Sequence, residues 1–393
     1  MNQQWGLQRL YRVTRVSIRC ISSSRSTTST LTATAYSDKM YQPIISEGFK
    51  GFDKLLVPKD FHAPNQEIRI DGGFQQELQN IVEAFKAPIK VSIGYGSGVL
   101  PQAGYDQQKQ QDSDKQIDFI HIVDDNYQFH LQNTQQFPSH YSTTNLAIIK
   151  LIQGSGIYFN PYISLNNRLI KYGIISKQSS VIDLTEWSSL YFAGRLQKPV
   201  NFIKDDDIMI KFLNQYNLKN AMSLSIILLD QLDLFTERQL YEQITKLSYL
   251  GDFRMAIGGE NPNKIKNIVE KQFNEFKQLY DPILSYFIQR NFLIIHENGE
   301  NRIFKSNLNA NNKIKLISTF PLQFRSQLYQ LYQEKSIKEI AKDKNLGKNL
   351  IKIVSRTIQT SSIKQSLRGF FSAGFFNSIK YAWAKNRKYR AVK

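Results

Sequence analysis

The chain has 393 residues, 41% of them hydrophobic and 12% aromatic, and a formal net charge of +18. This is the composition of a globular protein with room for two ordinary domains plus extensions. Its richest apolar stretches, residues 224–229 and 287–295, are soon interrupted by charged or amide side chains. Because roughly 20 consecutive apolar residues are needed to cross a bilayer, no membrane-spanning helix is expected.

The excess positive charge lies at the two ends of the chain. Residues 1–37 contain five arginines and no acidic residue, and residues 344–393 contain twelve lysines or arginines and no acidic residue. Residues 38–343 carry nearly equal numbers of basic and acidic side chains. A central body that is close to neutral argues against a general polyanion-binding surface, so nucleic acid is not expected as a partner.

Residues 1–37 are rich in Arg, Ser and Thr, which is the composition of a mitochondrial transit peptide. The alternative is a disordered basic tail. The only cysteine, Cys20, lies in this segment. If the segment is removed, the mature protein has no disulfide, no Cys-based zinc site and no Cys nucleophile.

Residues 38–70 show no firm period and are expected to form an irregular lead-in to the first helix. Between Gly73 and Phe85 apolar residues recur every three or four positions, which predicts an amphipathic helix that ends before Pro88.

Two predicted strands flank a glycine-rich turn. Residues 89–93 are largely apolar and run directly into Gly-Tyr-Gly-Ser-Gly at 94–98, which predicts a strand that opens into a turn. Residues 102–115 are polar and Gln-rich and are expected to form a mobile loop. Residues 117–123 form the second strand, with one carboxylate, Asp118, in an otherwise apolar run.

A hairpin follows, and then a helical region. Residues 157–165 and 168–175 have strand-like patterns and are joined by Asn-Asn, which is typical of a two-residue hairpin turn. From about residue 205 the pattern is mainly helical. Thr236 and Gln239 form a predicted capping box.

Apolar residues between 265 and 279 line one face of a further predicted helix, which is expected to end near Pro282.

The C-terminal segment has an amphipathic helical pattern. Its apolar residues recur at three and four positions: Ile363, Leu367, Phe370, Phe371, Phe375, Ile379 and Trp383. Basic residues take the other faces, and each one near an anionic lipid surface contributes on the order of 1 kcal/mol of binding free energy. We expect this helix to bind a membrane interface. The alternative is a helix that packs on its own domain with a basic exterior.

The glycine turn and the strand after it are the minimum of a polymerase-beta-type nucleotidyltransferase site. Glycines let the backbone approach a triphosphate, whose oxygens can accept hydrogen bonds from amide N–H groups and from the Ser97 hydroxyl. A carboxylate on the neighbouring strand, Asp118, can hold Mg²⁺. Taken alone, the turn is equally compatible with a tight connection between core elements.

Seven ordered blocks of sequence carry a family resemblance. They are GYGSGVLPQ (94–102), IDFIHIVDD (117–125), FHLQN (129–133), HYS (140–142), YFNPYISLNNRLIKYGIIS (158–176), LYFAGRLQKPV (190–200) and KLSYLGDFRMAIGGENPNKIKNIV (246–269). Together they resemble the mitochondrial phosphatidate cytidylyltransferases, also known as mitochondrial translocator assembly and maintenance proteins. The resemblance implies an enzyme that makes CDP-diacylglycerol and diphosphate from CTP and phosphatidic acid with Mg²⁺, and so feeds cardiolipin synthesis.

The resemblance also implies the fold class and the location. The fold is expected to be α+β, with a polymerase-beta-type nucleotidyltransferase domain at 38–204, a mainly helical, winged-helix-like domain at 205–340, and a basic amphipathic membrane-binding tail at 341–393. The protein is expected to be peripheral, on the anionic lipid surface of the matrix side of the mitochondrial inner membrane.

Four residues match the family's phosphate-binding turn and metal site. They are Gly96, Ser97 and Gly98 in the turn and Asp118 on the strand. Members of the superfamily usually carry two acids two residues apart on this strand, but Gln116 and Ile120 stand at the flanking positions here. The second metal ligand is therefore unassigned.

Other acids near this strand are weaker candidates for the missing ligand. Asp112 and Asp114 lie in the Gln-rich loop, where a solvated role is favoured. Asp124 and Asp125 follow the strand, where a turn role is favoured.

Three basic residues are candidates for binding phosphate groups. Lys171, in the second arm of the hairpin, could meet the triphosphate or the lipid phosphate, and we expect it to act with Ser97 and Asp118 in catalysis. The alternative is an edge lysine that points to solvent. Arg195 and Lys198 are candidates for the same anion binding.

Other polar residues are expected to be structural. Arg254 could equally pair with Asp252 or Glu260, and His130 and His140 lack metal-ligand spacing. No strong general base is needed, because a phosphate nucleophile is already ionised.

Two other functions are compatible with the sequence. One is an RNA or small-molecule nucleotidyltransferase, which the neutral body and the amphipathic tail disfavour, since RNA binding needs a basic track beside the active site. The other is a peripheral inner-membrane assembly factor for protein import without catalysis, in which the glycine turn is only structural.

Overall fold

The computed structural model describes residues 57–100, 116–154, 156–252, 261–333 and 335–373, all within one compact unit, Tyr41–Lys393. These residues form a mixed structure of helices and strands, which confirms the α+β class. Within the described ranges, no helix is both long enough and apolar enough to cross a membrane.

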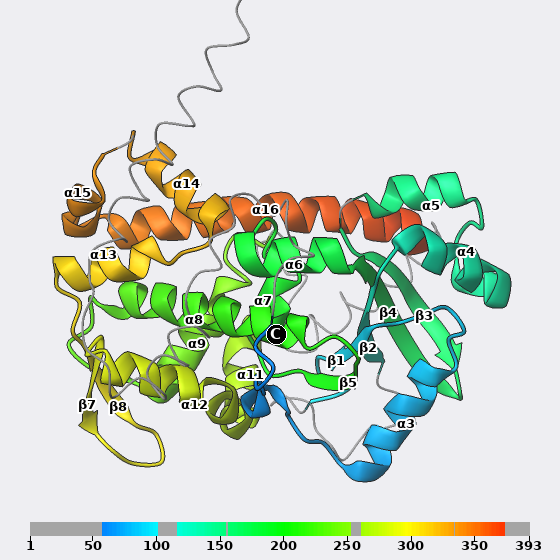
Figure 1. Cartoon of the computed structure of the whole chain (residues 1–393), viewed down its shortest axis with the longest axis horizontal. Coiled ribbons are helices and arrows are strands. Elements are labelled where there is room, and N and C mark those ends of the chain that lie inside the picture. The colour runs from blue at the N-terminus through cyan, green and yellow to red at the C-terminus, as the bar shows by residue number, and fades with distance from the viewer. Residues whose placement is uncertain (1–56, 101–115, 155, 253–260, 334, 374–393) are drawn as a thin grey trace, which may run out of the picture. The chain divides into compact units, whose positions relative to one another are not determined.

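A five-stranded mixed sheet carries the glycine turn. Its strands are β1 (Val91–Tyr95), β2 (Ile117–Val123), β3 (Tyr158–Leu165), β4 (Arg168–Ser176) and β5 (Asn201–Asp205). The strand order is β3-β4-β2-β1-β5, with β3 and β5 at the edges (Figure 1). Strands β2 and β4 are parallel, and the other neighbours are antiparallel.

These strands follow the sequence pattern closely. The second predicted strand has the bounds of β2, whereas β1 begins two residues later than expected. The hairpin of β3 and β4 is confirmed: Asn166 and Asn167 have φ values of 50° and 59°, the left-handed conformation that a two-residue turn needs.

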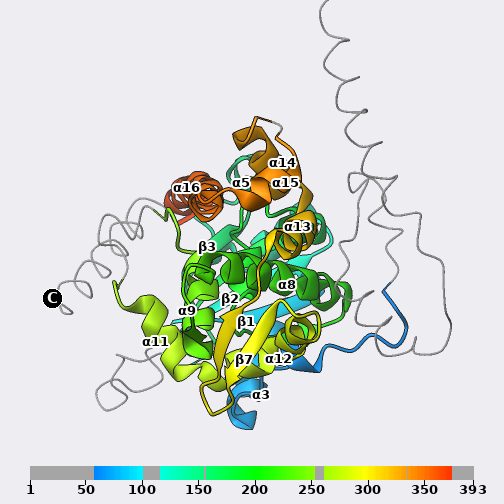
Figure 2. The same cartoon turned by 90° about the vertical axis from the view of Figure 1, so that its left-hand side faces the viewer.

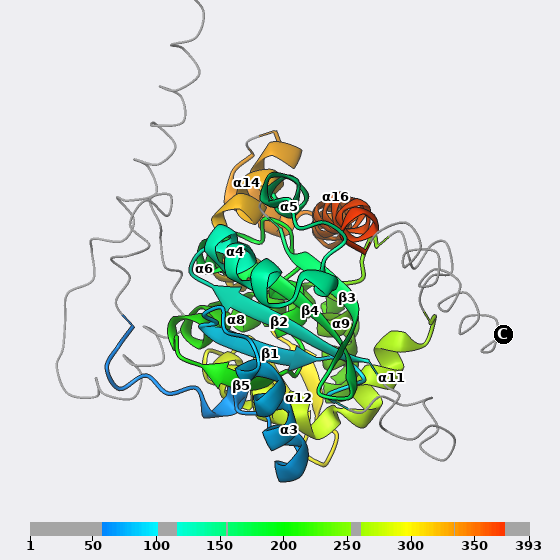
Figure 3. The ribbon, with the colours of Figure 1, turned by 90° about the vertical axis from the view of Figure 1, so that its right-hand side faces the viewer.

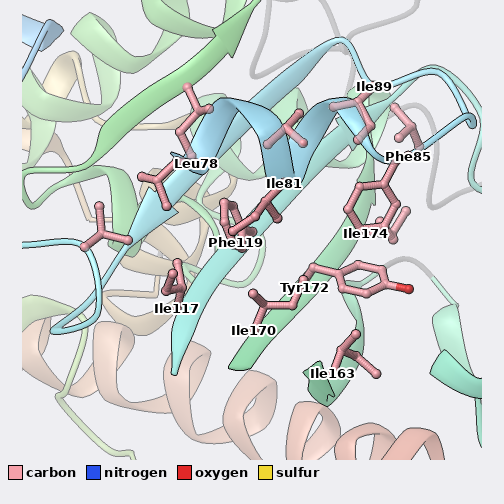
Figure 4. Packing of buried hydrophobic residues seen from close by; sticks show 14 of the residues in the cluster. Leu78, Ile81, Phe85, Ile89, Ile117, Phe119, Ile163, Ile170, Tyr172 and Ile174 are labelled. Atoms are coloured by element: carbon pink, nitrogen blue, oxygen red, sulfur yellow. The ribbon is translucent and has the colours of Figure 1, made fainter. Parts of the chain in front are cut away.

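One face of the sheet packs against α3 (Gly72–Glu83) and α4 (Asn126–Gln136). Helix α3 confirms the first predicted helix, and its N-cap Asp71 accepts a hydrogen bond from the N–H of Phe74. Figure 4 shows the cluster of buried side chains, among them Leu78, Ile81, Phe119, Ile170 and Tyr172. Burial of one such aliphatic side chain contributes about 1.5–3 kcal/mol, so this cluster fixes the position of β2 and β4.

Two helices between β2 and β3 were missed by the sequence analysis. They are α4 and α5 (Leu146–Gln153), with a short 3₁₀ turn, Pro138–His140, between them. Helix α4 is polar around most of its surface and therefore has little amphipathic signal. Its start is set by Asp125, whose carboxylate accepts hydrogen bonds from the N–H groups of Tyr127 and Gln128.

The chain from β4 onward leads into a buried central helix, α8 (Met209–Leu229). Helices α6 (Lys177–Glu186) and α7 (Ala193–Leu196) precede β5, and α6 contacts both β2 and β4. Every residue of α8 from Ile210 to Leu229 is buried. Asn217 on α8 accepts hydrogen bonds from Trp187 and Gln197 and donates one to the carbonyl of Ala193, which fixes α7 against α8.

A small sheet of three strands lies beside the next helices. Its order is β6 (Phe235–Thr236), β8 (Ile303–Ser306) and β7 (Leu293–Glu297), and it contacts α9 (Glu237–Leu247) and α12 (Phe273–Gln289). Figure 2 shows β7 beside α12. The capping box of Thr236 and Gln239 at the start of α9 is confirmed.

The single helix predicted over residues 265–279 is wrong in two respects. The structure has two helices, α11 (Lys264–Lys271) and α12, which meet at Gln272. Helix α12 also continues through Pro282 to Gln289, although a proline inside a helix costs about 3 kcal/mol. Burial on both sides of the proline offsets that cost; the buried residues are Phe273, Phe276, Leu279, Tyr280, Ile283, Leu284 and Phe287.

Four helices complete the described chain: α13 (Ala310–Ser318), α14 (Leu322–Leu331), α15 (Ile337–Lys342) and α16 (Leu346–Ala373). Helix α16 contacts β3, α5, α8 and α14. Its N-terminal half is buried at Leu350, Val354 and Ile358, whereas Ile363 and Leu367 are exposed.

Some predictions fall outside the described residues. These are the transit peptide at 1–37, the Gln-rich loop at 102–115, and the positions of Phe375, Ile379 and Trp383. The domain boundaries after residues 204 and 340 stay predictions.

Candidate active site

Ser97 lies two residues after the end of β1, in a bend that requires glycine on both sides. Gly96 has a φ of 79°, which L side chains rarely adopt. Its carbonyl oxygen accepts hydrogen bonds from the N–H groups of Val99 and Leu100, at 3.1 and 2.8 Å, and closes one helical turn. A Cβ at Gly98 would lie 2.2 Å from the carbonyl oxygen of Gln116, so only glycine lets the bend rest on the start of β2.

The bend leaves backbone donors available. Among the described residues, no acceptor is bonded to the amide N–H of Ser97 or Gly98. Consecutive amides at the start of a helical turn can bind an anion, because they carry partial positive charge. This part of the site is therefore suited to phosphate oxygens.

Three neighbouring strands bring Tyr95, Asp118 and Lys171 into one row. Tyr95 pairs with Asp118, and Asp118 with Lys171, so all three side chains leave the same face of the sheet. Lys171 Nζ lies 3.0 Å from Asp118 Oδ1. A Cβ on Gly96 would lie 3.3 Å from the other oxygen, Asp118 Oδ2. The carboxylate of Asp118 thus lies between the lysine and the glycine bend.

The Asp118–Lys171 pair is partly accessible to solvent. The two side chains are 25% and 21% exposed. Lys171 Nζ also lies 4.6 Å from the centre of the Phe159 ring, which covers Gly173 on the same strand. Because β4 lies between β3 and β2, Lys171 is on an inner strand, and the alternative of an edge lysine that points to solvent does not describe this structure.

Arg195, on α7, extends the cationic part of the site. Its guanidinium carbon lies 3.9 Å from the centre of the Tyr191 ring and 5.3 Å from that of Tyr95. It also donates a hydrogen bond to the carbonyl of Tyr191. Cation–π contacts of this kind hold the planar guanidinium in one orientation. Since Tyr95 neighbours Asp118 across the strands, Arg195 adjoins the same row.

Lys198 lies in the same cationic region. Its Nζ donates hydrogen bonds to the carbonyl of Gly194 and, at 2.7 Å, to Ser248 Oγ. Burial, together with repulsion by Arg195 and Lys264, lowers the pKa of Lys198 to about 7. A nearby anion stabilises the charged form of such an amine, so a bound phosphate would raise the pKa of Lys198 and keep it protonated.

Magnesium is the metal that the resemblance implies, and the residues present fit one mode of binding it. No cluster of three or more His, Cys, Asp or Glu side chains that could hold a metal occurs in the described ranges. Mg²⁺, however, is commonly held by one or two carboxylates together with water and substrate phosphates. The accessible carboxylate of Asp118 beside the bend suits a metal that binds together with a nucleotide.

Two histidines of the resemblance blocks, His130 and His140, have structural roles, as predicted. His130 Nδ1 and Nε2 each lie 2.9 Å from a partner, Tyr141 Oη and Gln153 Oε1 respectively. His140 Nδ1 lies 2.9 Å from Tyr172 Oη. Burial lowers the pKa of each histidine to about 4, so both are neutral near pH 7.

The acids after β2 also have structural roles. Asp125 caps α4, as described above, and Asp124 pairs with Lys90 at 3.4 Å. Asp112, Asp114 and Arg254 lie outside the described residues.

One site-organising residue escaped the sequence analysis. The buried carboxylate of Asp183, on α6, accepts hydrogen bonds from the N–H groups of four later residues, Ser189, Leu190, Phe192 and Ala193. It thereby shapes the segment that carries Tyr191 and leads into Arg195. The available signal was an acid in the apolar run Val-Ile-Asp-Leu at 181–184.

Comparison with known proteins gives a consistent result. A family model described as "Phosphatidate cytidylyltransferase, mitochondrial" matches residues 78–388. A Schizosaccharomyces pombe protein of that name is 35% identical over 360 residues, which cover 85% of this chain and 89% of the relative. The Saccharomyces cerevisiae protein of the same name is 35% identical over 83% of this chain and 74% of its own. The Mus musculus protein is 32% identical over 79% of this chain and 94% of its own.

Proposed function

The chain belongs to the family of mitochondrial phosphatidate cytidylyltransferases, and we propose that Ser97, Asp118 and Lys171 form the centre at which it joins CTP to phosphatidate. Its activity is that of the family: CTP and phosphatidate give CDP-diacylglycerol and diphosphate. The assignment of this centre depends on the position of the Asp118 carboxylate. One oxygen lies at the glycine bend, and the other lies 3.0 Å from Lys171 Nζ.

The reaction needs anion binding more than proton transfer. A phosphate oxygen of phosphatidate forms a bond to the α-phosphorus of CTP, and the bond from that phosphorus to the β-phosphate bridging oxygen breaks. Diphosphate leaves with the electron pair. Because the nucleophile is already ionised near neutral pH, no side chain has to remove a proton. The neutral, structural histidines agree with this scheme.

Different side chains and amides of the site bind different parts of the substrates' negative charge. The amides of Ser97 and Gly98 and the Ser97 hydroxyl bind oxygens of the triphosphate. Lys171 neutralises charge near the reacting phosphorus, and Arg195 and Lys198 bind further phosphate oxygens. Donors fixed before the reaction stabilise developing charge without reorganisation, which lowers the barrier.

Mg²⁺ is the proposed cofactor, and Asp118 is the residue that would hold it. When bound, the metal neutralises charge on the triphosphate. Asp118 and Lys171 attract each other while no nucleotide is bound, so the pair keeps both side chains beside the bend.

Two finer features of the fold belong to the same proposal. The five-stranded sheet with its Gly-Ser bend supports a nucleotidyltransferase domain of polymerase-beta type over residues 38–204. The helices α9, α11 and α12 followed by the β7–β8 hairpin support a winged-helix-like domain over residues 205–340.

We also propose that the enzyme is peripheral on the matrix side of the mitochondrial inner membrane, where its product feeds cardiolipin synthesis. The relatives are named mitochondrial. The apolar residues exposed on α16, Ile363, Leu367 and Phe371, support attachment of residues 341–393 to an anionic lipid surface. CTP, phosphatidate and that surface are the proposed partners, and nucleic acid is not.

Purified protein with CTP, Mg²⁺ and vesicles that contain phosphatidate tests the proposal. We expect CDP-diacylglycerol and diphosphate in equal amounts. Vesicle binding without product under any divalent cation would favour the assembly-factor function. Nucleotide transfer to RNA in preference to lipid would favour the alternative nucleotidyltransferase.

A further inference from the structure

A cavity of about 370 Å³ lies between residues 356–368 of α16, α6 and the segment 188–192. It does not include Ser97, Asp118 or Lys171. Three basic side chains of α16 line it: Arg356, Lys364 and Arg368. Hydroxyl groups of serine and threonine line much of the rest. Cations and hydroxyls together are the donors that a phosphate group requires.

The positive charge of this cavity is not balanced from within. Its one carboxylate is Asp183, whose oxygens already accept hydrogen bonds from backbone N–H groups. In the part of the chain that the structure describes, no ion pair joins Arg356, Lys364 or Arg368 to an acid. Cations gathered without a counter-charge favour an anionic ligand.

Arg368 is built into the cavity wall. A Cβ on Gly154 or Gly156 would lie 2.7 or 1.9 Å from its guanidinium nitrogens, so the arginine rests directly on the backbone of this turn. Burial lowers the pKa of Arg368. A nearby anion would offset that cost of burying its charge.

The cavity adjoins the candidate active site without being part of it. Ile175 lines it and leaves the same face of β4 as Lys171. The two positions are four steps apart along the strand, which is about 13 Å. Tyr191 lines the cavity and also contacts Arg195. A ligand in the cavity therefore lies close to the reacting groups, along the same face of the sheet.

An exposed apolar surface runs beside the cavity mouth. On α16, Ile363, Leu367 and Phe371 are spaced four residues apart and are 43%, 57% and 59% exposed. Helix α5, which contacts α16 and lies near its C-terminal end in Figures 1 and 3, adds Leu151, which is 83% exposed. Cations beside an exposed apolar stripe suit a molecule with a phosphate head and acyl chains.

We propose that this cavity is an entry site that binds the phosphate group of phosphatidate, while its acyl chains lie along the apolar surface of α16 and α5. The identity of the lipid rests on the proposed function. A phosphate monoester carries up to two negative charges, which suits three cations better than the single charge of a phosphodiester. The lipid then moves along the sheet to the reacting site beside Lys171.

Two double variants on one helix test the proposal with the same loss of charge. Lys364→Gln with Arg368→Gln removes two cations from the cavity. Lys348→Gln with Lys352→Gln removes two exposed cations of α16 that do not line it. Each protein is measured for binding to vesicles with phosphatidate or with phosphatidylglycerol at equal surface charge, and for KM with vesicle phosphatidate and with CTP.

We expect the wild type and the control variant to prefer phosphatidate vesicles. The cavity variant should lose that preference. Its KM for vesicle phosphatidate should rise at least about tenfold, because a tenfold loss of affinity corresponds to the loss of one charge-assisted hydrogen bond. Its KM for CTP should stay unchanged. Equal effects of both variants would overturn the entry site, because α16 would then act only by general attraction. The entry site would also be overturned if glycerol 3-phosphate competed with phosphatidate vesicles for the wild type at concentrations as low as those of the lipid, because the cavity would then bind a free phosphate monoester as tightly as lipid.

Two further measurements keep these outcomes interpretable. Lys364→Gln alone changes an exposed side chain and should show part of the effect even if the Arg368 variant folds poorly. A wild type that makes no CDP-diacylglycerol yet prefers phosphatidate vesicles would refute the proposed function and leave the entry site standing.

Discussion

Neighbouring residues of β4 face two different environments. Tyr172 faces α4, where its hydroxyl bonds to His140 and Asn133, and the histidines there are neutral. Lys171 faces the glycine bend and pairs with Asp118, while Arg195 lies against the neighbouring Tyr95 ring and repels Lys198. Both environments hold polar groups at low exposure. Among these described side chains on the Lys171 face, three cations stand against one carboxylate, an imbalance that a bound anion would correct, and this is the side of the sheet on which we place the proposed site.

Removal of Lys171 should have the largest effect on that side. We expect Lys171→Met to lower kcat/KM by about 10²- to 10³-fold, because a fixed cation beside the reacting phosphate is lost. Stability should change little, since a partly exposed ion pair is worth about 0–1 kcal/mol. Steady-state kinetics and thermal unfolding of the same preparations measure both, and a large loss of stability with modest kinetic change would make Lys171 structural.

The Tyr172 side should instead respond to acid. The pKa of His130 is about 4 in the folded protein and near 6.5 when unfolded, so its contribution to stability is complete above pH 6.5 and is lost as pH falls towards 4. The loss is on the order of 3 kcal/mol from this residue. Urea unfolding at pH 7.5 and 5 should show a flatter pH dependence in His130→Gln than in His296→Gln, whose side chain is exposed. Identical slopes would contradict the assignment.

Lys198 should give a smaller and pH-dependent effect. Its pKa is about 7 without ligand, so CTP should bind more weakly as pH rises from 6 to 8, when the amine loses its proton. We expect KM for CTP to rise several-fold, up to about tenfold per pH unit at most. Lys198→Arg keeps the charge and should remove this dependence. A wild-type KM that does not change over this range would exclude Lys198 from phosphate binding.

Sequence patterns predicted the elements whose pattern is local. The strand with Asp118, the Asn-Asn hairpin and the Thr236 capping box all depend on neighbouring residues, and all are confirmed. Helix α4 was missed because its sequence has little apolar periodicity, and the end of α12 was misjudged because a proline such as Pro282 is expected to end a helix. Pro282 is tolerated only because aromatic residues on both sides are buried.

The sequence indicated which residues belong to the candidate site, but it did not indicate how they are arranged in space. The glycine turn and Asp118 follow from chemistry and resemblance, but their approach depends on β1 pairing with β2 at Tyr95 and Asp118. Tyr95, Tyr191 and Asp183 were missed, because aromatic and buried acidic residues are also common in ordinary cores. Their role is visible only once α7 and the sheet are placed together.

The most direct test of the account is turnover by Asp118→Asn. The account predicts that CDP-diacylglycerol formation with saturating CTP and Mg²⁺ falls by at least about 10²- to 10³-fold, because the carboxylate beside the glycine bend is lost. Thermal unfolding should stay close to that of the wild type, since the side chain is partly exposed. Wild-type turnover in Asp118→Asn would contradict the central claim that this carboxylate organises the reaction.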